Sequence, residues 1–110
     1  MTKAFTPRSR KVRVLATLGP ASNSAEMIGK LFEAGADAFR INMSHGDQQS
    51  KLPVIAAIRA LEKEYNRPTT ILADLQGPKL RVGRFAEGKV LLETGSQFIL
   101  DRSDAPGDAT

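Results

Sequence analysis

The sequence predicts an α/β fold with parallel strands, followed by a short all-β region. From residue 11 to residue 74, apolar patterns typical of strands and helices alternate, with short loops between them. This order implies parallel strands joined by right-handed helical crossovers. After residue 78 the helical pattern stops, and short strand patterns separated by turn residues follow. Such a pattern is typical of antiparallel β structure.

The composition fits one small globular domain. The chain has 110 residues, 41% hydrophobic and 25% charged, which allows a modest core. The absence of cysteine excludes disulfides, thiolate metal sites and a cysteine nucleophile. No apolar run approaches the roughly 18 residues of a membrane span, and no signal peptide is evident. We therefore expect a cytoplasmic protein with no membrane partner.

Positive charge is concentrated at the amino terminus. The net charge is +4, and the first 13 positions hold five of the 16 lysines and arginines. These charges suit either phosphate or nucleic acid, or simply a solvated terminus. One tyrosine and no tryptophan leave little for base stacking, so we expect no nucleic-acid partner. Residues 1–10 are predicted to form a flexible amino-terminal arm.

The first predicted strand, residues 11–18, is followed by a helix. Asn23 and Glu26 have the spacing of a capping box, and Gly35 is a natural C-cap. The spacing of apolar residues between them predicts a helix over residues 24–34. Its buried side chains would be Met27, Ile28, Leu31 and Phe32.

The second predicted strand lies within residues 37–46 and carries unexpected polar groups. Alternation along a strand gives it an apolar face made of Phe39, Ile41 and Met43. The other face would hold Ala38, Arg40 and Asn42, with Ser44 following if the strand stays extended. A guanidinium and an amide in a strand flanked by helices are costly unless paired. This mismatch marks a candidate site.

A second helix and a third strand come next. Asp47 or Ser50 can cap the helix, and Pro53 fits best in the first turn, which favours a start near Ser50. The buried stripe would be Leu52, Ile55, Ile58, Leu61 and Tyr65. After the break at residues 66–68, residues 69–74 are predicted to form the strand.

Three short strands are predicted after this, at residues 79–85, 89–93 and 97–100. Glycine-containing turns separate them. We therefore divide the chain after the arm into a β/α region at 11–82 and an all-β region at 83–110.

Polar residues gather where the three parallel strands end. In parallel α/β folds the ligand site lies at these carboxyl ends. The cations there, suited to phosphate or carboxylate, are Arg40, Lys79 and Arg81. The oxygen ligands, suited to potassium, calcium or magnesium, are Asn42, Ser44 and Asp74. Thr17 and His45 lie at the same ends. Together, these residue types indicate a site for an anionic ligand with a cation beside it.

Each of these residues also has a purely structural interpretation. Arg40 would then pair with Asp74 inside the fold, Asn42 and Ser44 would hydrogen-bond a turn, and His45 would have no catalytic role. No nucleophile triad or glycine-rich phosphate loop is present. The residues alone indicate an anion-binding α/β module.

Three motifs go further. Residues 16–22 (ATLGPAS), 39–46 (FRINMSHG) and 74–83 (DLQGPKLRVG) together resemble the amino-terminal part of the pyruvate kinase family. The resemblance implies the first β/α units of a (β/α)8 TIM barrel, followed by the start of an inserted small β-barrel lid domain. It also implies a cytoplasmic homotetramer that uses Mg²⁺ in glycolysis. The reaction would transfer a phosphoryl group from phosphoenolpyruvate to ADP, giving pyruvate and ATP.

The resemblance also assigns roles. Arg40 would bind the substrate phosphate, and His45 and Arg81 would bind the nucleotide. The monovalent-cation ligands would be Asn42, Ser44, Asp74 and the carbonyl of Leu75. Where many family members have Thr-Lys-Gly-Pro-Glu, this chain has LQGPK at 75–79. The Lys79 ammonium can replace the bound ion, so we expect no potassium requirement.

The family's catalytic lysine and magnesium ligands belong to later barrel strands, which this sequence lacks. Three strands cannot close a barrel. We therefore expect the chain to be an incomplete, inactive fragment. The alternatives are a free-standing α/β module that binds a phosphorylated metabolite without catalysis, and a structural fragment without a ligand.

Overall fold

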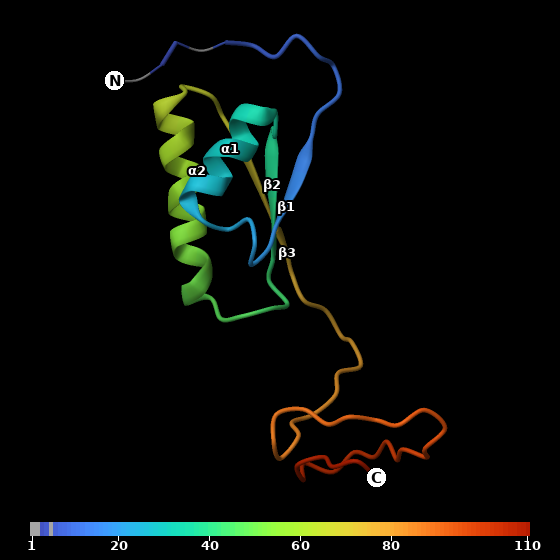
Figure 1. Ribbon diagram of the computed structural model, residues 1–110. Coiled ribbons are helices and arrows are strands. Elements are labelled where there is room, and N and C mark those ends of the chain that lie inside the picture. Colours follow the sequence, from blue (N-terminus) through green and yellow to red (C-terminus); the bar gives the residue numbers. More distant parts are fainter. Residues whose placement is uncertain (1–2, 5) are drawn as a thin grey trace. The chain divides into compact units, whose positions relative to one another are not determined.

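The structure is a computed structural model that describes residues 3–4 and 6–110 (Figure 1). The chain divides into two compact units, Met1–Gly77 and Pro78–Thr110. Among the described residues, all helices and named strands lie in the first unit. The division falls five residues before the expected limit at residue 82.

A three-stranded parallel sheet is the centre of the first unit. Its strands are β1 (Leu15–Leu18), β2 (Ala38–Asn42) and β3 (Thr70–Asp74), with β2 in the middle. The helices α1 (Ala25–Ala34) and α2 (Leu52–Glu64) lie on the same side of the sheet (Figure 1). A short 3-10 helix, η1 (Gln49–Lys51), precedes α2. The predicted strand–helix–strand–helix–strand order is confirmed.

The core lies between this face of the sheet and the two helices. Phe39 and Ile41 of β2 are buried, as the alternation predicts, while Arg40 and Asn42 are only partly buried. The other buried apolar side chains are Leu18, Ile28, Phe32, Ala36, Val54 and Ile58. The central strand therefore keeps one face for packing and leaves its polar face available.

Helix α1 begins and ends nearly as the sequence indicates, but a different residue caps it. The Ser24 hydroxyl accepts a hydrogen bond from the Met27 amide at 3.2 Å, so Ser24 is the N-cap and the prediction of Asn23 is wrong. Asparagine and serine are both good N-cap residues, so the sequence alone does not distinguish Asn23 from Ser24 as the cap. Gly35, at φ 128°, is the C-cap.

Helix α2 starts close to Ser50, as Pro53 indicated. The Asp47 carboxylate accepts the Ser50 amide at 2.7 Å, and the chain then turns through η1 into α2. The predicted buried stripe is wrong at its first member, because Leu52 is 57% exposed and Val54 is buried instead. The first residue of α2 lies outside the face that contacts the core.

The amino-terminal strand is shorter than predicted. Residues 11–14 do not join β1, and the Val14 amide binds the Asp37 carboxylate instead. The flexible-arm prediction falls partly on residues 1, 2 and 5, which lie outside the described residues. Arg8 and Arg10 of the same arm form ion pairs with Asp37, so this part is attached to the domain.

The second unit lacks the three predicted strands. Its described residues contain one isolated β-bridge, a parallel one between Phe85 and Gly107. The two predicted turns form, with Gly88 and Gly95 at positive φ. Apolar side chains such as Leu80 and Leu91 remain exposed, so this unit has no apolar layer against which short strands could pack.

Candidate functional site

The carboxyl ends of the three strands bring most of the predicted site residues to one edge of the sheet. Arg40 is in register with Thr17 of β1, and Asn42 is in register with Asp74 of β3. The Met43 amide donates to the Asp74 carbonyl at 3.0 Å, which extends the pairing past the end of β2. Parallel strands produce this convergence because they all end at the same side.

Arg40 is paired with Asp74. Its Nε donates to Oδ2 at 3.0 Å, and Nη2 donates to the same oxygen. The pair is partly exposed, with 30% of the Arg40 side chain accessible. Among the described residues, Nη1 of Arg40 has no partner. The structural interpretation of this pair is therefore correct, and the guanidinium still has donors for a ligand.

Asn42 and Ser44 form a turn. The Asn42 side-chain oxygen accepts the Ser44 amide at 2.9 Å, which is the second structural interpretation that the sequence allowed. His45 follows as an exposed side chain. Within the described ranges, no group of three or more histidine, aspartate or glutamate side chains is placed to hold a metal ion.

A hollow of about 620 Å³ lies beside this edge. Thr17 and the Gly19-Pro20 turn after β1 contribute to it, together with Asn42 and His45 after β2. Arg40 and Asp74 do not line it. The edge therefore has two adjacent parts, the Arg40–Asp74 pair and the hollow.

The remaining predicted residues follow β3. Leu75 comes directly after the strand and belongs to the first unit, with its side chain exposed. Lys79 and Arg81 belong to the second unit and are exposed.

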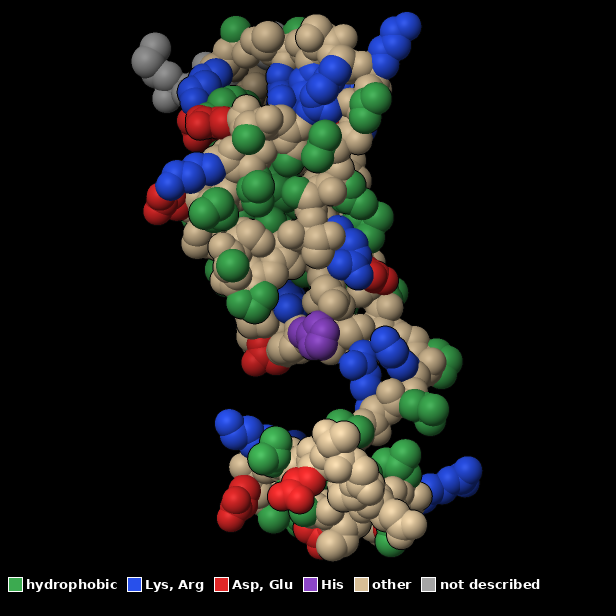
Figure 2. Space-filling model, turned by 45° about the vertical axis from the view of Figure 1, so that its right-hand side comes forward, with side chains coloured by type: hydrophobic (Ala, Val, Ile, Leu, Met, Phe, Trp, Pro, Cys, Tyr) green, Lys and Arg blue, Asp and Glu red, His purple; other side chains and the backbone are tan. Residues whose placement is uncertain are grey.

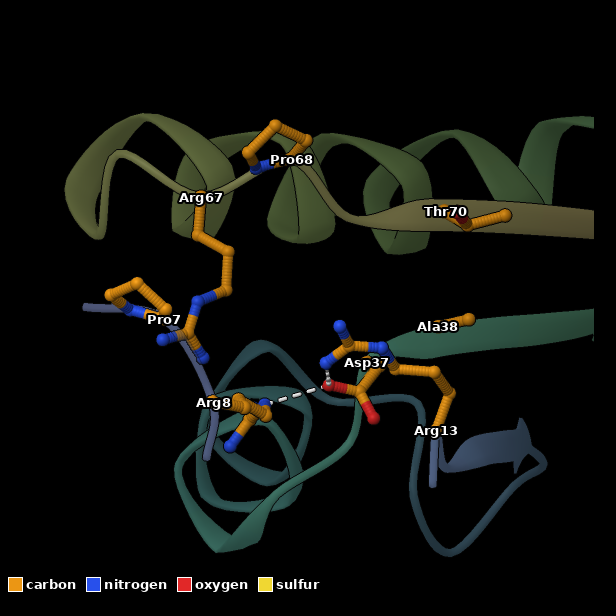
Figure 3. Close-up of a pocket in the computed structure, with 8 residues that line it drawn as sticks. All are labelled: Pro7, Arg8, Arg13, Asp37, Ala38, Arg67, Pro68 and Thr70. Atoms are coloured by element: carbon orange, nitrogen blue, oxygen red, sulfur yellow. Dashed lines mark ion pairs between the residues drawn. The ribbon is translucent and has the colours of Figure 1, made fainter. Parts of the chain in front are cut away.

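A second hollow, of about 400 Å³, lies where the strands begin (Figure 3). It contains Asp37, which the site analysis of the sequence missed. Arg8 and Arg10 approach the Asp37 carboxylate to 2.7 and 2.9 Å, and Arg67 also lines the hollow. Figure 2 shows basic side chains gathered at this end of the first unit. The five cations within residues 3–13 were the signal that could have found it.

The pKa of Asp37 reflects this environment. Burial by itself raises the pKa, but the Val14 amide and the guanidinium groups of Arg10 and Arg8 outweigh it, so the pKa is lowered. Arg8 also donates to the carbonyls of Phe32 and Ala36, both at 2.9 Å. These contacts join the arm to the end of α1 and the start of β2.

Comparison with known proteins identifies the family. The family model described as "Pyruvate kinase, barrel domain" matches residues 9–109. The chain belongs to the pyruvate kinase family. Its three motifs led to the same assignment, which is confirmed, and the parallel α/β sheet agrees with the start of the pyruvate kinase barrel.

Pyruvate kinases from several organisms are similar to this chain. That of Methylorubrum extorquens is 54% identical over 101 residues, covering 92% of this chain and 21% of the relative. One from Agrobacterium vitis is 45% identical, covering 94% and 22%. A crystal structure of a Cryptosporidium parvum pyruvate kinase has a TM-score of 0.67 at 31% identity, covering 91% and 21%. The chain thus spans about a fifth of the pyruvate kinases it matches.

The pyruvate kinase motifs coincide with the sheet edge. Residues 16–22 and 39–46 supply the ends of β1 and β2 and most of the hollow, and residues 74–83 start at the last residue of β3.

In the described part of the chain, no helix has both the length and the apolar character to cross a membrane.

Proposed function

We propose that this chain forms the first part of a pyruvate kinase active site. The reaction is phosphoryl transfer from phosphoenolpyruvate to ADP, giving pyruvate and ATP. The observation that carries the proposal is Arg40, fixed by Asp74 at the carboxyl edge of a parallel sheet with free donors remaining. In phosphoryl transfer, positioning and charge stabilisation supply most of the catalysis.

Arg40 has the properties of a ligand for the substrate phosphate. A guanidinium can bind two oxygens of one anion in its own plane. Pairing with Asp74 restricts the orientation of the Arg40 guanidinium and therefore the direction from which a phosphate can bind. His45 and Arg81 are proposed nucleotide residues. His45 lines the hollow with Thr17 and Asn42.

The monovalent-cation position would use Asn42, Ser44, Asp74 and the carbonyl of Leu75. The oxygen chemistry of this set fits such an ion. However, Asn42 Oδ1 already accepts an amide, and Asp74 Oδ2 already accepts a guanidinium. This partial occupation supports the proposal that Lys79 supplies the positive charge and that potassium is not required.

The remaining functions of the enzyme would come from residues beyond these 110. We place the magnesium ligands and the catalytic lysine there. The same proposal includes a cytoplasmic homotetramer, as the family implies, in which this segment alone is inactive.

A hybrid enzyme tests the proposal. Residues 9–109 would replace the matching segment of the Methylorubrum extorquens pyruvate kinase, to which they are 54% identical. We expect pyruvate formation from phosphoenolpyruvate and ADP in the hybrid, and its loss in an Arg40→Gln variant. An exposed lysine of α2 gives the control, Lys63→Gln, which should keep full activity. A hybrid that folds, by circular dichroism, but forms no pyruvate would contradict the proposal.

Two further measurements complete the test. Replacing potassium by tetramethylammonium should leave the hybrid active, and Lys79→Glu should make it potassium-dependent. Complete loss of activity without potassium would rule out the role of Lys79. Calorimetric binding of phosphoenolpyruvate by the 110-residue chain, combined with a folded but inactive hybrid, would favour the free-standing module instead.

A further inference from the structure

The amino-terminal arm is held on the first unit by charge. It is described at residues 3–4 and 6–13, and these positions hold five lysines and arginines. No described apolar residue before Ala16 belongs to the core or packs against it. The contacts of the arm are instead ion pairs and hydrogen bonds to backbone carbonyls. A segment attached in this way can detach without opening the apolar core.

One end of the arm lies on the last residues of α2. The Lys3 amide donates to the Glu64 carbonyl at 2.6 Å, and the Lys3 ammonium lies 3.0 Å from the Glu64 carboxylate. The same ammonium is 3.7 Å from the centre of the Tyr65 ring, an attractive cation–π arrangement. Arg67 donates to the Thr6 carbonyl. About half of the Lys3 and Glu64 side chains is exposed, so this attachment is weak and sensitive to salt.

The other end of the arm supplies cations that α1 lacks. The last turn of α1 contains no basic residue, although positive charge stabilises the carboxyl end of a helix. Arg8 donates to the carbonyls of Phe32 and Ala36, both at 2.9 Å. Arg10 donates to the Gly35 carbonyl. The arm therefore satisfies carbonyls at and just after the end of α1.

Asp37 joins the arm to the start of the sheet. Arg8 Nε lies 2.7 Å from its Oδ1, and Arg10 Nη1 lies 2.9 Å from its Oδ2 (Figure 3 shows the first pair). The Val14 amide donates to the same carboxylate at 2.7 Å, and the Asp37 amide donates to the Val14 carbonyl at 2.9 Å. One carboxylate thus binds both the cations of the arm and the residue that precedes β1.

We propose that the arm is a strap that opens and closes as one unit, held shut by the charge of Asp37, while the sheet and helices stay folded. Local opening of this kind occurs in segments with few buried apolar contacts. In the open state the carbonyls after α1 would bind water, and the backbone before β1 would lose its contact with the Asp37 carboxylate. The far end of β1 carries Thr17 of the candidate site, so closing the strap also steadies the first strand of that edge.

Limited digestion of the 110-residue chain with trypsin tests the proposal. Trypsin must bind the side chain of Arg8 to cut after it, and this side chain is only 15% exposed in the closed strap. Cleavage after exposed Lys79 is the reference in the same sample, and cleavage after Arg40 in β2 reports unfolding of the domain. Asp37→Asn should speed cleavage after Arg8 about ten-fold relative to Lys79, as for loss of a charged hydrogen bond. Glu26→Gln, which breaks an exposed pair on α1, should have no effect.

A second variant tests whether the strap opens as one unit. Lys3→Met removes the ion pair on α2, far along the arm from Arg8, and should still speed cleavage after Arg8 by roughly two- to five-fold. Sodium chloride should act in the same direction on the wild type, because it screens the exposed pairs. Cleavage after Arg40 should stay slow in both cases.

Three results would overturn the proposal. The first is unchanged cleavage after Arg8 in a folded Asp37→Asn variant. The second is unchanged cleavage after Arg8 in Lys3→Met, which would mean that the two ends of the arm open separately. The third is cleavage after Arg40 that rises in parallel in Lys3→Met or in salt, which would mean that the whole domain opens. If circular dichroism showed Asp37→Asn to be unfolded, the Lys3→Met and salt results would decide alone.

Discussion

Arg40 and Asp74 are joined across two neighbouring parallel strands, with Nε of the arginine 3.0 Å from Oδ2 of the aspartate. The strand register places Asn42 opposite Asp74, so the side chain of Arg40 reaches along the sheet toward the end of β3. The pair compensates the charge that a guanidinium brings into a central strand. It also fixes the guanidinium before any ligand is bound, which favours anion binding.

Arg40→Lys in the hybrid enzyme tests this preorganisation. Lysine keeps the positive charge, but its ammonium lacks the planar set of donors with which a guanidinium can bind Asp74 and a phosphate at the same time. We expect the Michaelis constant for phosphoenolpyruvate to rise about ten-fold, as for loss of a charged hydrogen bond, with that for ADP unchanged. Steady-state kinetics with each substrate varied in turn would measure this. Arg59→Lys, at an exposed ion pair of α2, is the control, and an equal rise for both substrates would contradict the argument.

Asp37→Asn should destabilise the first unit. The carboxylate accepts the Val14 amide and pairs with the guanidinium groups of Arg8, Arg10 and Arg13, so neutralising it should lower the free energy of unfolding by roughly 2 kcal/mol. Urea unfolding followed by circular dichroism would measure the loss. Glu26→Gln breaks an exposed pair with Lys30 and should change little. A similar loss of unfolding free energy in both variants would show that the contacts of Asp37 stabilise the fold no more than an exposed ion pair does.

The same carboxylate predicts a pH dependence. The folded-state pKa of Asp37 is lowered, so its stabilisation is fully present above the unfolded value of about 3.9. It is lost as the pH falls through the lower folded value. The difference in unfolding free energy between wild type and Asp37→Asn should therefore be constant near neutral pH and shrink in acid. A difference that grows in acid would contradict this sign.

The strand and helix order was predictable because each element has a periodic apolar pattern and clear ends. Phe39 and Ile41 alternate with polar residues in β2, and Gly35 ends α1 at a positive φ that only glycine adopts easily. The second unit was not predictable in the same way. Its short apolar patterns resemble strands, but Leu80 and Leu91 stay exposed, and strands need a packing face that local sequence does not specify.

Part of the site was also predictable, because its residues lie at the ends of predicted strands. Polar residues at strand ends converge in any parallel sheet, so Arg40 and Asp74 could be placed together from the sequence. The Asp37 cluster depends on Arg8 and Arg10, which lie more than 25 residues earlier in the chain. Lys51 stands at a helix start, and no periodic pattern shows whether such a side chain turns toward a hollow or into solvent.

Glu62 should stabilise the entry into β3. Its Oε1 accepts the amide of buried Thr69 at 3.0 Å, and Oε2 pairs with Arg59 at 2.8 Å. The Thr69 hydrogen bond, followed by Arg59, lowers the pKa of Glu62. Glu62→Ala leaves the Thr69 amide without a partner and should cost about 1–3 kcal/mol, whereas Glu62→Gln keeps an acceptor and should cost less. Urea unfolding and hydrogen exchange at Thr69 would compare them, and equal costs would show that the acceptor is unimportant.

Gly46 is the position where the backbone itself limits substitution. It has φ 71°, and an added Cβ would lie 3.1 Å from the Ser50 hydroxyl. Gly46→Ala should therefore lower the unfolding free energy by about 1–2 kcal/mol, the usual cost of a left-handed conformation. It should also displace the Lys51 ammonium, which is 3.5 Å from the same point.

Gly77→Ala is the matched control for this last variant. Gly77 is not among the residues with positive φ, and a Cβ there meets no atom within 4 Å. Its replacement should be neutral or stabilise by about 0.4–1 kcal/mol, because alanine restricts the unfolded chain. Urea unfolding of both variants, with the Lys51 ammonium followed by nuclear magnetic resonance, would separate the backbone effect from the loss of space. If Gly46→Ala were as stable as Gly77→Ala, the loop after β2 would have to adopt another conformation. The open space at Gly46 would then no longer explain where the Lys51 ammonium lies.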